Sequence, residues 1–427
     1  MAEAGEGLGG LLTAAQAGNL DAQLRMGADC FRRAKFNEAA EWFRLAAGQG
    51  SAEAQNSLAT LRLNGMGVAQ DTHAAFSFFE SAALAGLREA HYNLSILYFN
   101  GIGVRRDTPR AGEHLLVAAR AGHRAALRSL GFLYHAAGED GDWPRLSSHC
   151  FRVAAEAGDA YSKYLWGLRL LRGHGQPADR AAAQEWFAAA ARDGVALAAL
   201  RAAGAKPHSA SDVRSTRNEQ PFELRTFSIP DLPAPHASRS VAFMSEHLDV
   251  LDDYLCDHLM NVAASKLAPS GVVDPHTGAA LQSEKRTSYS MHFQPSMYDT
   301  SVYLSLRCIA NVAGQPMEHA EPLGILRYGP GQEYKPHYDY YSDDRHEAQR
   351  VSTVFVYLND VAEGGGTDFP RLQARVEPAR GKAVKFLNCG PDGKPNPDTL
   401  HAGLPVIRGE KWLATLWFWD RPFLWFA

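Results

Sequence analysis

The stretch GQEYKPHYDYY, residues 331–341, places a histidine and an aspartate two positions apart, at His337 and Asp339. On an extended chain, residues i and i+2 point to the same face, so these two side chains can approach one metal ion from the same side. The spacing alone is a weak signal. A second histidine-x-aspartate triplet lies in the run 241–267, where leucines three and four residues apart predict a helix. A metal site therefore requires a third ligand elsewhere in the chain.

His401 is the candidate for that third ligand, since it stands at the start of another β-like segment. Two imidazoles and one carboxylate form the facial arrangement that suits Fe(II) and leaves three coordination positions open. Lys411 follows in the apolar segment KWLATLWFWD, where a buried ammonium would need an anionic partner such as a dicarboxylate cosubstrate. Two plainer interpretations stay open: a loop ion pair between His337 and Asp339, and a lysine that faces solvent.

The elements that would position these residues are short strands. They are rich in Val, Ile, Phe, Tyr and Trp, they are bounded by Gly, Pro, Asn or Asp, and no helical pattern separates them. The predicted strand segments are residues 321–329, 350–359, 381–388, 400–409 and 411–420. This pattern predicts an antiparallel β-barrel or jelly roll.

The first half of the chain has a different pattern, an internal repeat of 36 residues. Alanine-rich pentapeptides that end in glycine recur at this interval, starting at Ala46, Ala82, Ala118, Ala154 and Ala190. Such a fixed period is the signature of a solenoid. The pentapeptide at Ala14 precedes the next by only 32 residues, which predicts an atypical capping unit.

Each repeat is predicted to form two helices separated by a glycine loop. The loops NGMGV and NGIGV begin at Asn64 and Asn100, and their glycines tolerate the backbone angles at which a helix ends. A superhelical array of this kind creates an extended concave surface, so we expect it to bind a protein or peptide. The alternative is an array that only stabilises the neighbouring domain or forms a dimer.

Composition limits the class of protein. The chain has 427 residues, is 46% hydrophobic and 21% charged, and carries a net charge of −4 at pH 7, so we expect no nucleic-acid or membrane partner. The N-terminus lacks the regions of a signal peptide, and no apolar run approaches the roughly 18 residues that span a bilayer. Five separated cysteines without a C-x-x-C pair predict apolar packing in a reducing, cytoplasmic protein.

From these patterns we divide the chain into three parts. Residues 1–205 form an α-helical repeat domain, residues 206–231 form a linker in which proline, serine and charge replace alanine, and residues 232–427 form a β-rich domain with a helical preface. One short strand is expected in the linker region, at residues 222–229.

The β-rich part resembles the prolyl 4-hydroxylase branch of the Fe(II)/2-oxoglutarate dioxygenases. The resemblance rests on an ordered series: KRTS, RYGPGQEYKPHYDY, RVSTVFVYLNDVAEGGGTDFP, VEPARGKAVKF and LHAGLPVIRGEKW. It implies a double-stranded β-helix with Fe(II), 2-oxoglutarate, O2 and L-ascorbate as reductant. The repeats over residues 14–205 resemble Sel-one-like repeats, which are relatives of the tetratricopeptide repeat.

The resemblance also implies a role for each site residue. His337, Asp339 and His401 would hold the iron, and Lys411 would pair with the distal carboxylate of 2-oxoglutarate. The remaining expected contacts are Tyr328, Thr353 and Trp417 to the cosubstrate and Arg350, Tyr334 and Arg286 on the substrate side. Tyr338, which alternates away from the metal, is expected to be a packing residue.

The function that follows is hydroxylation of a C–H bond, best matched by a prolyl residue in a peptide or protein that the repeats recruit. Two alternatives stay open: a hydroxylase of a free amino acid or small metabolite, and a repeat-based adaptor or oxygen sensor with slow turnover. Turnover with a proline-containing protein, a peptide or free proline would separate them.

Overall fold

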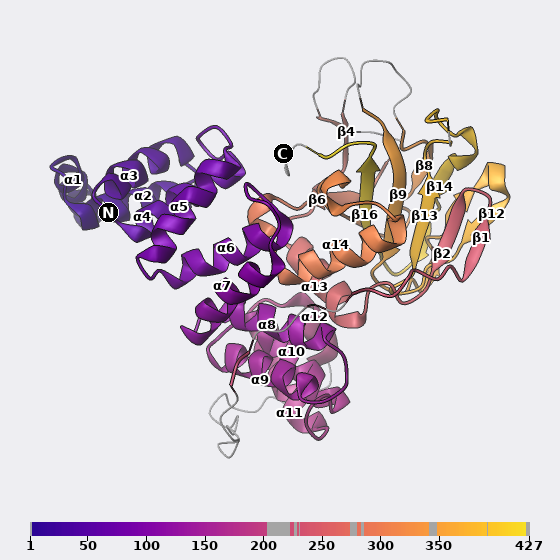
Figure 1. Cartoon of the computed structure of the whole chain (residues 1–427), viewed down its shortest axis with the longest axis horizontal. Coiled ribbons are helices and arrows are strands. Elements are labelled where there is room, and N and C mark those ends of the chain that lie inside the picture. Colours follow the sequence, from indigo (N-terminus) through magenta and orange to yellow (C-terminus); the bar gives the residue numbers. More distant parts are fainter. Residues whose placement is uncertain are drawn as a thin grey trace.

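The chain forms a helical array joined to a β-sandwich (Figure 1). The computed structural model describes residues 2–202, 223–225, 229, 231–273, 280–282, 286–340, 348–390 and 392–423. Within this part of the chain, every helix is too short or too polar to span a lipid bilayer.

The array consists of paired helices. They are α1 (Ala2–Gln16), α2 (Leu20–Arg32), α3 (Phe36–Gly48), α4 (Ala52–Asn64), α5 (Thr72–Leu84), α6 (Arg88–Asn100), α7 (Thr108–Arg120), α8 (Arg124–Ala136), α9 (Trp143–Glu156), α10 (Ala160–Arg172), α11 (Arg180–Arg192) and α12 (Ala196–Ala202). The helices α4, α6, α8, α10 and α12 begin 36 residues apart, and α2 begins 32 residues before α4. Both the predicted period and the shorter first unit are confirmed.

Repeated caps explain why the helices begin and end where they do. Asp71 and Asp107 occupy matching positions in two repeats, and each side chain accepts a hydrogen bond from a backbone N–H at the start of the next helix. Gly65 and Gly101 end α4 and α6 in the left-handed conformation. Gly173 ends α10 in the same way, although the loop there reads RGHGQ.

The C-terminal part contains two main antiparallel sheets. The large sheet has the order β1 (Arg239–Val241), β2 (Met244–His247), β13 (Ala383–Leu387), β9 (Arg350–Tyr357), β16 (Lys411–Trp419), β7 (Gly324–Tyr328), β6 (Tyr289–His292), β3 (Ala268–Pro269). The small sheet has the order β12 (Ala374–Val376), β11 (Thr367–Phe369), β14 (His401–Gly403), β8 (Tyr334–His337). The jelly-roll prediction is confirmed.

The remaining elements are short pairs and helices. Two further strand pairs are β10 (Glu363–Gly364) with β15 (Val406–Arg408), and β4 (Gly271–Val273) with β5 (Ala280–Gln282). The helices are α13 (Asp253–Ala264) and α14 (Thr300–Ala313), with single turns η2 (Pro295–Met297), η3 (Met317–His319), η4 (Pro370–Leu372) and η5 (Pro397–Thr399). Gly364 and Gly365, with φ of 77° and 73°, turn the chain from β10 towards β11.

Two predicted elements are wrong in extent. The helix predicted over residues 241–267 begins only at Asp253, after the Asp252 cap, and residues 244–247 form strand β2. Leu248 fits the leucine spacing by chance and is 55% exposed. The segment 400–409 forms two strands, β14 and β15, in different sheets. The strand expected at residues 222–229 lies mainly outside the described residues.

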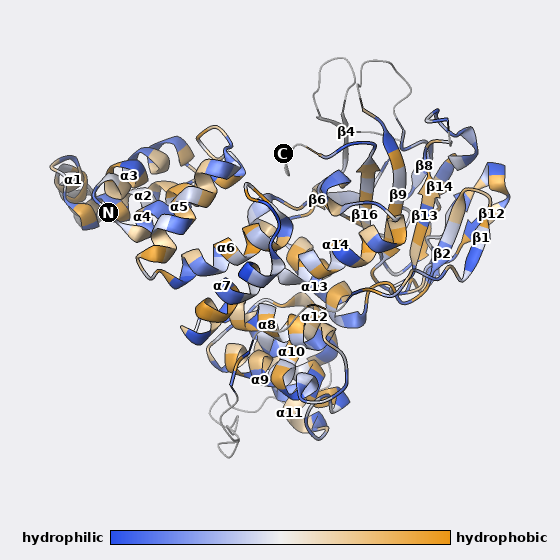
Figure 2. Ribbon diagram, viewed as in Figure 1, coloured by the Kyte–Doolittle hydropathy of each residue, from blue (hydrophilic) through white to orange (hydrophobic). Residues whose placement is uncertain are grey.

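The helical array packs against the helices that cover the large sheet. Helix α14 contacts β9 and β13 on one side and α6 and α8 on the other, while α12 contacts α13 and α4 contacts η2. Figure 2 shows hydrophobic residues along β13 and β16 and on α14. One cluster of buried apolar side chains continues from the repeats through α13 and α14 into the sheet. The first helices of the repeats therefore pack against this chain's own β-rich domain.

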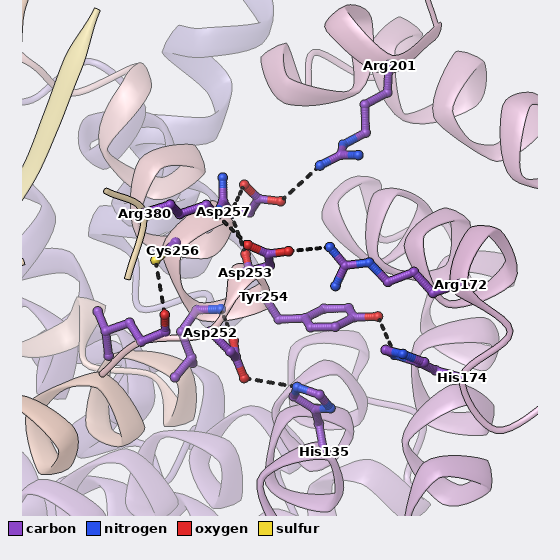
Figure 3. A network of polar contacts seen from close by, with 12 residues as sticks. His135, Arg172, His174, Arg201, Asp252, Asp253, Tyr254, Cys256, Asp257 and Arg380 are labelled. Atoms are coloured by element: carbon purple, nitrogen blue, oxygen red, sulfur yellow. Dashed lines mark hydrogen bonds and ion pairs between the residues drawn. The ribbon is translucent and has the colours of Figure 1, made fainter. Parts of the chain in front are cut away.

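Polar contacts reinforce this boundary (Figure 3). Asp257 on α13 is 2% exposed and accepts hydrogen bonds from Tyr164 Oη of α10 and from Arg380 Nη2, both at 2.6 Å. Further contacts between the array and α13 or its cap are Arg172 with Asp253, His135 with Asp252, and His174 with Tyr254. A buried carboxylate that Tyr164 and Arg380 share ties the two parts of the molecule together.

Candidate active site

The three predicted metal ligands meet at one edge of the small sheet. His337 ends β8, Asp339 lies two residues beyond it, and His401 begins β14 as the register partner of His337. One donor atom from each residue lies within 4.8 Å of the other two. His337 Nε2 is 3.6 Å from Asp339 Oδ1, and His401 Nε2 is 3.9 Å from Asp339 Oδ2. Among the described residues, this is the cluster that can hold a metal ion.

Backbone carbonyls fix the orientation of both imidazoles. His337 Nδ1 lies 2.9 Å from the Lys335 carbonyl oxygen, and His401 Nδ1 lies 3.0 Å from the Thr399 carbonyl oxygen. A carbonyl can only accept, so each Nδ1 donates and each Nε2 keeps a lone pair that faces Asp339. Both rings are therefore arranged as metal ligands before any metal binds.

Strand β9 orients the carboxylate. Thr353 Oγ1 donates to Asp339 Oδ2 at 2.8 Å and accepts from Asn388 Nδ2 at 2.9 Å. Both Thr353 and Asn388 are buried, so this short chain of hydrogen bonds is shielded from water. The expected contribution of Thr353 was to the cosubstrate pocket, and the structure gives it a contact with Asp339 as well.

The protonation states suit a cation. Burial and, to a smaller extent, the neighbouring His401 lower the pKa of His337 to about 3, against the opposite effect of Asp339. Burial raises the pKa of Asp339, but the two histidines lower it more, so the carboxyl pKa lies below its ordinary value. A neutral imidazole beside an ionised carboxylate is the form in which these groups bind metal.

Lys411 lies at the floor of the same cavity. It is fully buried, its Nζ has no hydrogen-bond partner among the described residues, and the Nζ stands 4.2 Å from the centre of the Tyr328 ring. Burial lowers its pKa to about 7. The interpretation of Lys411 as a solvent-facing charge is therefore wrong. A buried cation without a partner is costly, and it marks a place where an anion fits.

All ten predicted site residues line one cavity of about 420 Å³. They are Arg286, Tyr328, Tyr334, His337, Asp339, Arg350, Thr353, His401, Lys411 and Trp417. Tyr338 also lines this cavity, which corrects the expectation that it only packs away from the site. Gly403 leaves room here, because an added Cβ would come within 3.3 Å of Lys411 Nζ.

Ionic and aromatic contacts shape the opposite wall. Arg350 donates to both carboxylate oxygens of Glu321, at 2.5 and 2.8 Å, and lies 4.4 Å from the centre of the Trp417 ring. Arg286 lies 5.1 Å from the centre of the Tyr334 ring, which in turn stacks on His337. Arg286 and Arg350, both expected on the substrate side, thus each lie over an aromatic ring: Tyr334, also expected there, and Trp417, expected at the cosubstrate.

The cavity contains groups that the sequence did not single out. Glu321 is the partner of Arg350, Asn388 is the partner of Thr353, and His292 lines the wall beside Trp417. The second histidine-x-aspartate triplet is not part of a candidate metal site among the described residues. Its His247 instead hydrogen-bonds Ser245 Oγ at 2.9 Å. No spacing signal links Glu321 to Arg350. For His292, the alternation in YSMH would place it on the face of Ser290.

Family models match both halves of the chain. A model of the 2OG-Fe(II) oxygenase superfamily matches residues 323–419, and the superfamily implies Fe(II), 2-oxoglutarate and O2. A model of the Sel1 repeat matches residues 20–51, 52–87, 88–123 and 160–195. The repeat 124–159 is outside these matches, and its first helix, α8, ends at Ala136 with Ala137 as its C-cap in place of a left-handed glycine.

Two solved structures resemble separate halves of the chain. A viral collagen prolyl hydroxylase of Paramecium bursaria Chlorella virus-1 is 30% identical, with a TM-score of 0.35 over 42% of this chain and 97% of that one. A Sel1 repeat protein of Oxalobacter formigenes is 29% identical, with a TM-score of 0.42 over 45% of this chain and 57% of that one.

Plant proteins also resemble the C-terminal half of the chain. Prolyl 4-hydroxylase 5 of Arabidopsis thaliana is 35% identical over 190 residues, which are 39% of this chain and 65% of that protein, so the chain spans slightly less than two thirds of it. Prolyl 4-hydroxylase 1 of the same plant is 35% identical over 229 residues, 48% of this chain and 78% of that protein. With identity at that level over more than three quarters of a relative, the chain belongs to the prolyl 4-hydroxylase family of 2OG-Fe(II) oxygenases.

Proposed function

We propose that this protein is an Fe(II)- and 2-oxoglutarate-dependent dioxygenase that hydroxylates a prolyl residue in a peptide or protein. The observation that carries the proposal is the joint presence, in one cavity, of a two-histidine, one-carboxylate cluster and a buried lysine without a partner. The first is the donor set that suits Fe(II), and the second fits the far carboxylate of 2-oxoglutarate.

In this proposal His337, Asp339 and His401 hold the iron. When bound, Fe(II) with 2-oxoglutarate and O2 supplies the oxidising power to hydroxylate an unactivated C–H bond, with loss of CO2 and formation of succinate. Thr353 holds the Asp339 carboxylate at the position that its hydrogen bond defines. The Nδ1 contacts of both histidines keep Nε2 directed at the metal position.

Lys411 and its neighbours bind and orient the cosubstrate. The Lys411 ammonium pairs with the distal carboxylate at the dry end of the cavity, where charge attraction is strong. Tyr328 is buried beside Lys411 and supplies a hydroxyl for the same carboxylate. Thr353 and Trp417 form the wall between this end and the metal.

On the substrate side we assign Arg350, Tyr334 and Arg286. Tyr334 and Trp417 give the cavity wall its aromatic character, while Arg286 has a buried Nη2 without a partner among the described residues. The names of the plant relatives support a prolyl substrate. L-Ascorbate is the proposed reductant.

The repeats are proposed to recruit the polypeptide. Their inner helices from α4 to α12 contact the catalytic domain, so the surface for recruitment lies on the N-terminal repeats, which project away from the sheet in Figure 1. The shared apolar core also favours the second possibility, that the array stabilises the catalytic domain.

The experiment is a substrate comparison on the full chain. With Fe(II), 2-oxoglutarate and ascorbate present, poly-L-proline and free L-proline are each tested for a gain of one oxygen atom by mass spectrometry. The proposal expects hydroxyproline in the polypeptide and little in the free amino acid. The reverse preference would assign the site to a small metabolite, and decay of 2-oxoglutarate without any hydroxyproline would refute prolyl hydroxylation.

A further inference from the structure

His292 occupies the wall of the active-site cavity at the last residue of β6. It is the register partner of Gly324 on β7, and the alternation of the strand places it on the same face as Ser290. Both His292 and Arg286 line the cavity that contains the three metal-ligand candidates. Met291, one residue before it, points instead into the core. His292 is therefore directed at the space in which a substrate would lie.

The ring is held by its surroundings. A Cβ added at Gly324 would come within 3.3 Å of the His292 ring and 3.2 Å of Thr415 Cγ2, so the glycine provides the room in which the ring fits. The ring lies stacked 6.4 Å from the Trp417 ring, centre to centre. Packing of this kind limits the orientations of the imidazole without using its nitrogen atoms.

The nitrogen atoms of His292 are available for a ligand. No hydrogen bond from this ring to a described residue is present, and His292 is exposed, whereas Lys411 in the same cavity is fully buried. Two further donors in the same cavity wall, Trp417 Nε1 and Arg286 Nη2, are buried without partners among the described residues. His292, Trp417 and Arg286 thus give the cavity wall three polar groups without a hydrogen-bond partner among the described residues.

The charge state of His292 limits what that partner can be. Desolvation by the surrounding protein atoms lowers the pKa of His292. The positive charges of Arg286 and Arg350 lower this pKa further, and the negative charge of Glu321 raises it. At neutral pH the ring is therefore uncharged, with one N–H donor and one acceptor. The complementary group on a prolyl substrate is a main-chain carbonyl, which accepts the imidazole N–H, because the peptide bond before a proline has no N–H. A free amino acid presents a carboxylate and an ammonium, which favour charged partners.

We propose that His292 is a specificity-determining residue that donates a hydrogen bond to a main-chain carbonyl of the substrate, next to the residue that is hydroxylated. The inference rests on the proposed function and narrows its substrate class to a polypeptide. The inference gives a role to the His292 imidazole, which belongs neither to the three metal-ligand candidates nor to the residues proposed to bind the cosubstrate.

The test compares His292→Ala with His292→Asn, because asparagine keeps one donor and one acceptor at this position. Poly-L-proline and free L-proline are the probes, and KM and kcat are measured for each. Tyr289→Ala is the matched control, since Tyr289 lies on the same strand, is exposed and does not line the cavity. We expect His292→Ala to raise the KM for poly-L-proline about five- to tenfold, the loss of a typical hydrogen bond. His292→Asn should stay within about threefold of the wild type.

Three results would overturn the inference. They are a KM for poly-L-proline in His292→Ala equal to that of the wild type, an equal loss in His292→Asn, and an equal rise in the KM for free L-proline. Each of these leaves prolyl hydroxylation by the wild type intact and removes only the role of His292. If the wild-type protein consumes 2-oxoglutarate but hydroxylates neither probe, the proposed function itself fails and the inference fails with it.

Discussion

At the scale of single residues, we propose that the buried ammonium of Lys411 determines how strongly the site holds a dicarboxylate. The sequence predicted this residue and the three metal-ligand candidates, because an apolar strand around a lysine and an H-x-D triplet after a strand are both local patterns. It could not predict that Glu321 pairs with Arg350, 29 residues away, or that Asn388 supports Thr353, 35 residues away. Such pairs depend on which strands become neighbours.

Replacing Lys411 by Ala should weaken 2-oxoglutarate binding strongly. A hydrogen bond between charged groups contributes roughly 1.5–3 kcal/mol, so we expect the KM for 2-oxoglutarate to rise about ten- to a hundredfold. Lys385→Ala is the matched control, because Lys385 is half-buried in the same large sheet but does not line the cavity. An unchanged KM in Lys411→Ala would mean that another group binds the distal carboxylate.

The pKa of Lys411 also predicts a pH dependence. Burial lowers this pKa to about 7, so above that pH a growing fraction of the free protein holds a neutral amine. A carboxylate favours the ammonium form, and binding must then include uptake of a proton. The KM for 2-oxoglutarate should therefore rise with pH above about 7, by up to about tenfold per pH unit.

Lys411→Arg is the control for this pH dependence, since a guanidinium stays charged throughout the range. Kinetics between about pH 6 and about pH 9 supply the measurement. A wild-type KM that does not change with pH, or a rise that the arginine variant shares, would place the titrating group elsewhere.

At the scale of elements, three strands position the metal-ligand candidates. His337 ends β8, His401 begins β14, and Thr353 of β9 hydrogen-bonds Asp339. The sequence predicted the strands of the large sheet well, because their apolar runs are bounded by turn residues. It failed where one pattern covers two elements, as in residues 400–409, whose two strands belong to different sheets. It also failed at residues 244–247, where β2 is too short to show its own period before α13 begins.

Thr353→Val should separate the role of β9 from that of the ligands themselves. Valine keeps the shape of threonine but removes the hydroxyl that donates to Asp339 and accepts from the buried Asn388. Loss of such a supporting contact typically lowers metal affinity about 10- to 100-fold. Thr353→Ser, which keeps the hydroxyl, should retain most of the affinity. Iron titration of both variants tests this, and equal affinity of valine and serine variants would show that Asp339 needs no support.

At the scale of the whole molecule, the repeats and the oxygenase domain share one core. Asn100 on α6 donates to the Tyr298 carbonyl at 2.9 Å, 198 residues along the chain. The 36-residue period predicted the helices of the array. The period did not predict that helices α13 and α14 of the oxygenase domain pack against the array, since a repeat pattern describes contacts between neighbouring repeats alone. The boundaries 1–205, 206–231 and 232–427 and the cytoplasmic location stay predictions.

Asp257→Ala should destabilise both parts of the molecule together. It leaves Arg380 and Tyr164 without their shared buried acceptor, and removal of one partner from a buried ion pair typically costs about 3–5 kcal/mol. Calorimetry should show a single unfolding transition in the wild type and a lower midpoint in the variant. Glu41→Ala, in an exposed pair with Arg44, should change stability by less than about 1 kcal/mol. Two separate transitions in the wild type would contradict the shared core.

The most direct test of the account measures hydroxyproline formed per 2-oxoglutarate consumed, with bound iron determined on the same samples. Wild type, Asp339→Ala and Asp249→Asn are compared on poly-L-proline. Asp249 belongs to the second H-x-D triplet, and asparagine tolerates its φ of 54°. We expect coupled turnover and iron binding in the wild type and in Asp249→Asn. Asp339→Ala should bind iron weakly and form no hydroxyproline, because one anionic ligand is lost. Hydroxylation by Asp339→Ala at the wild-type rate would contradict the assignment of the site.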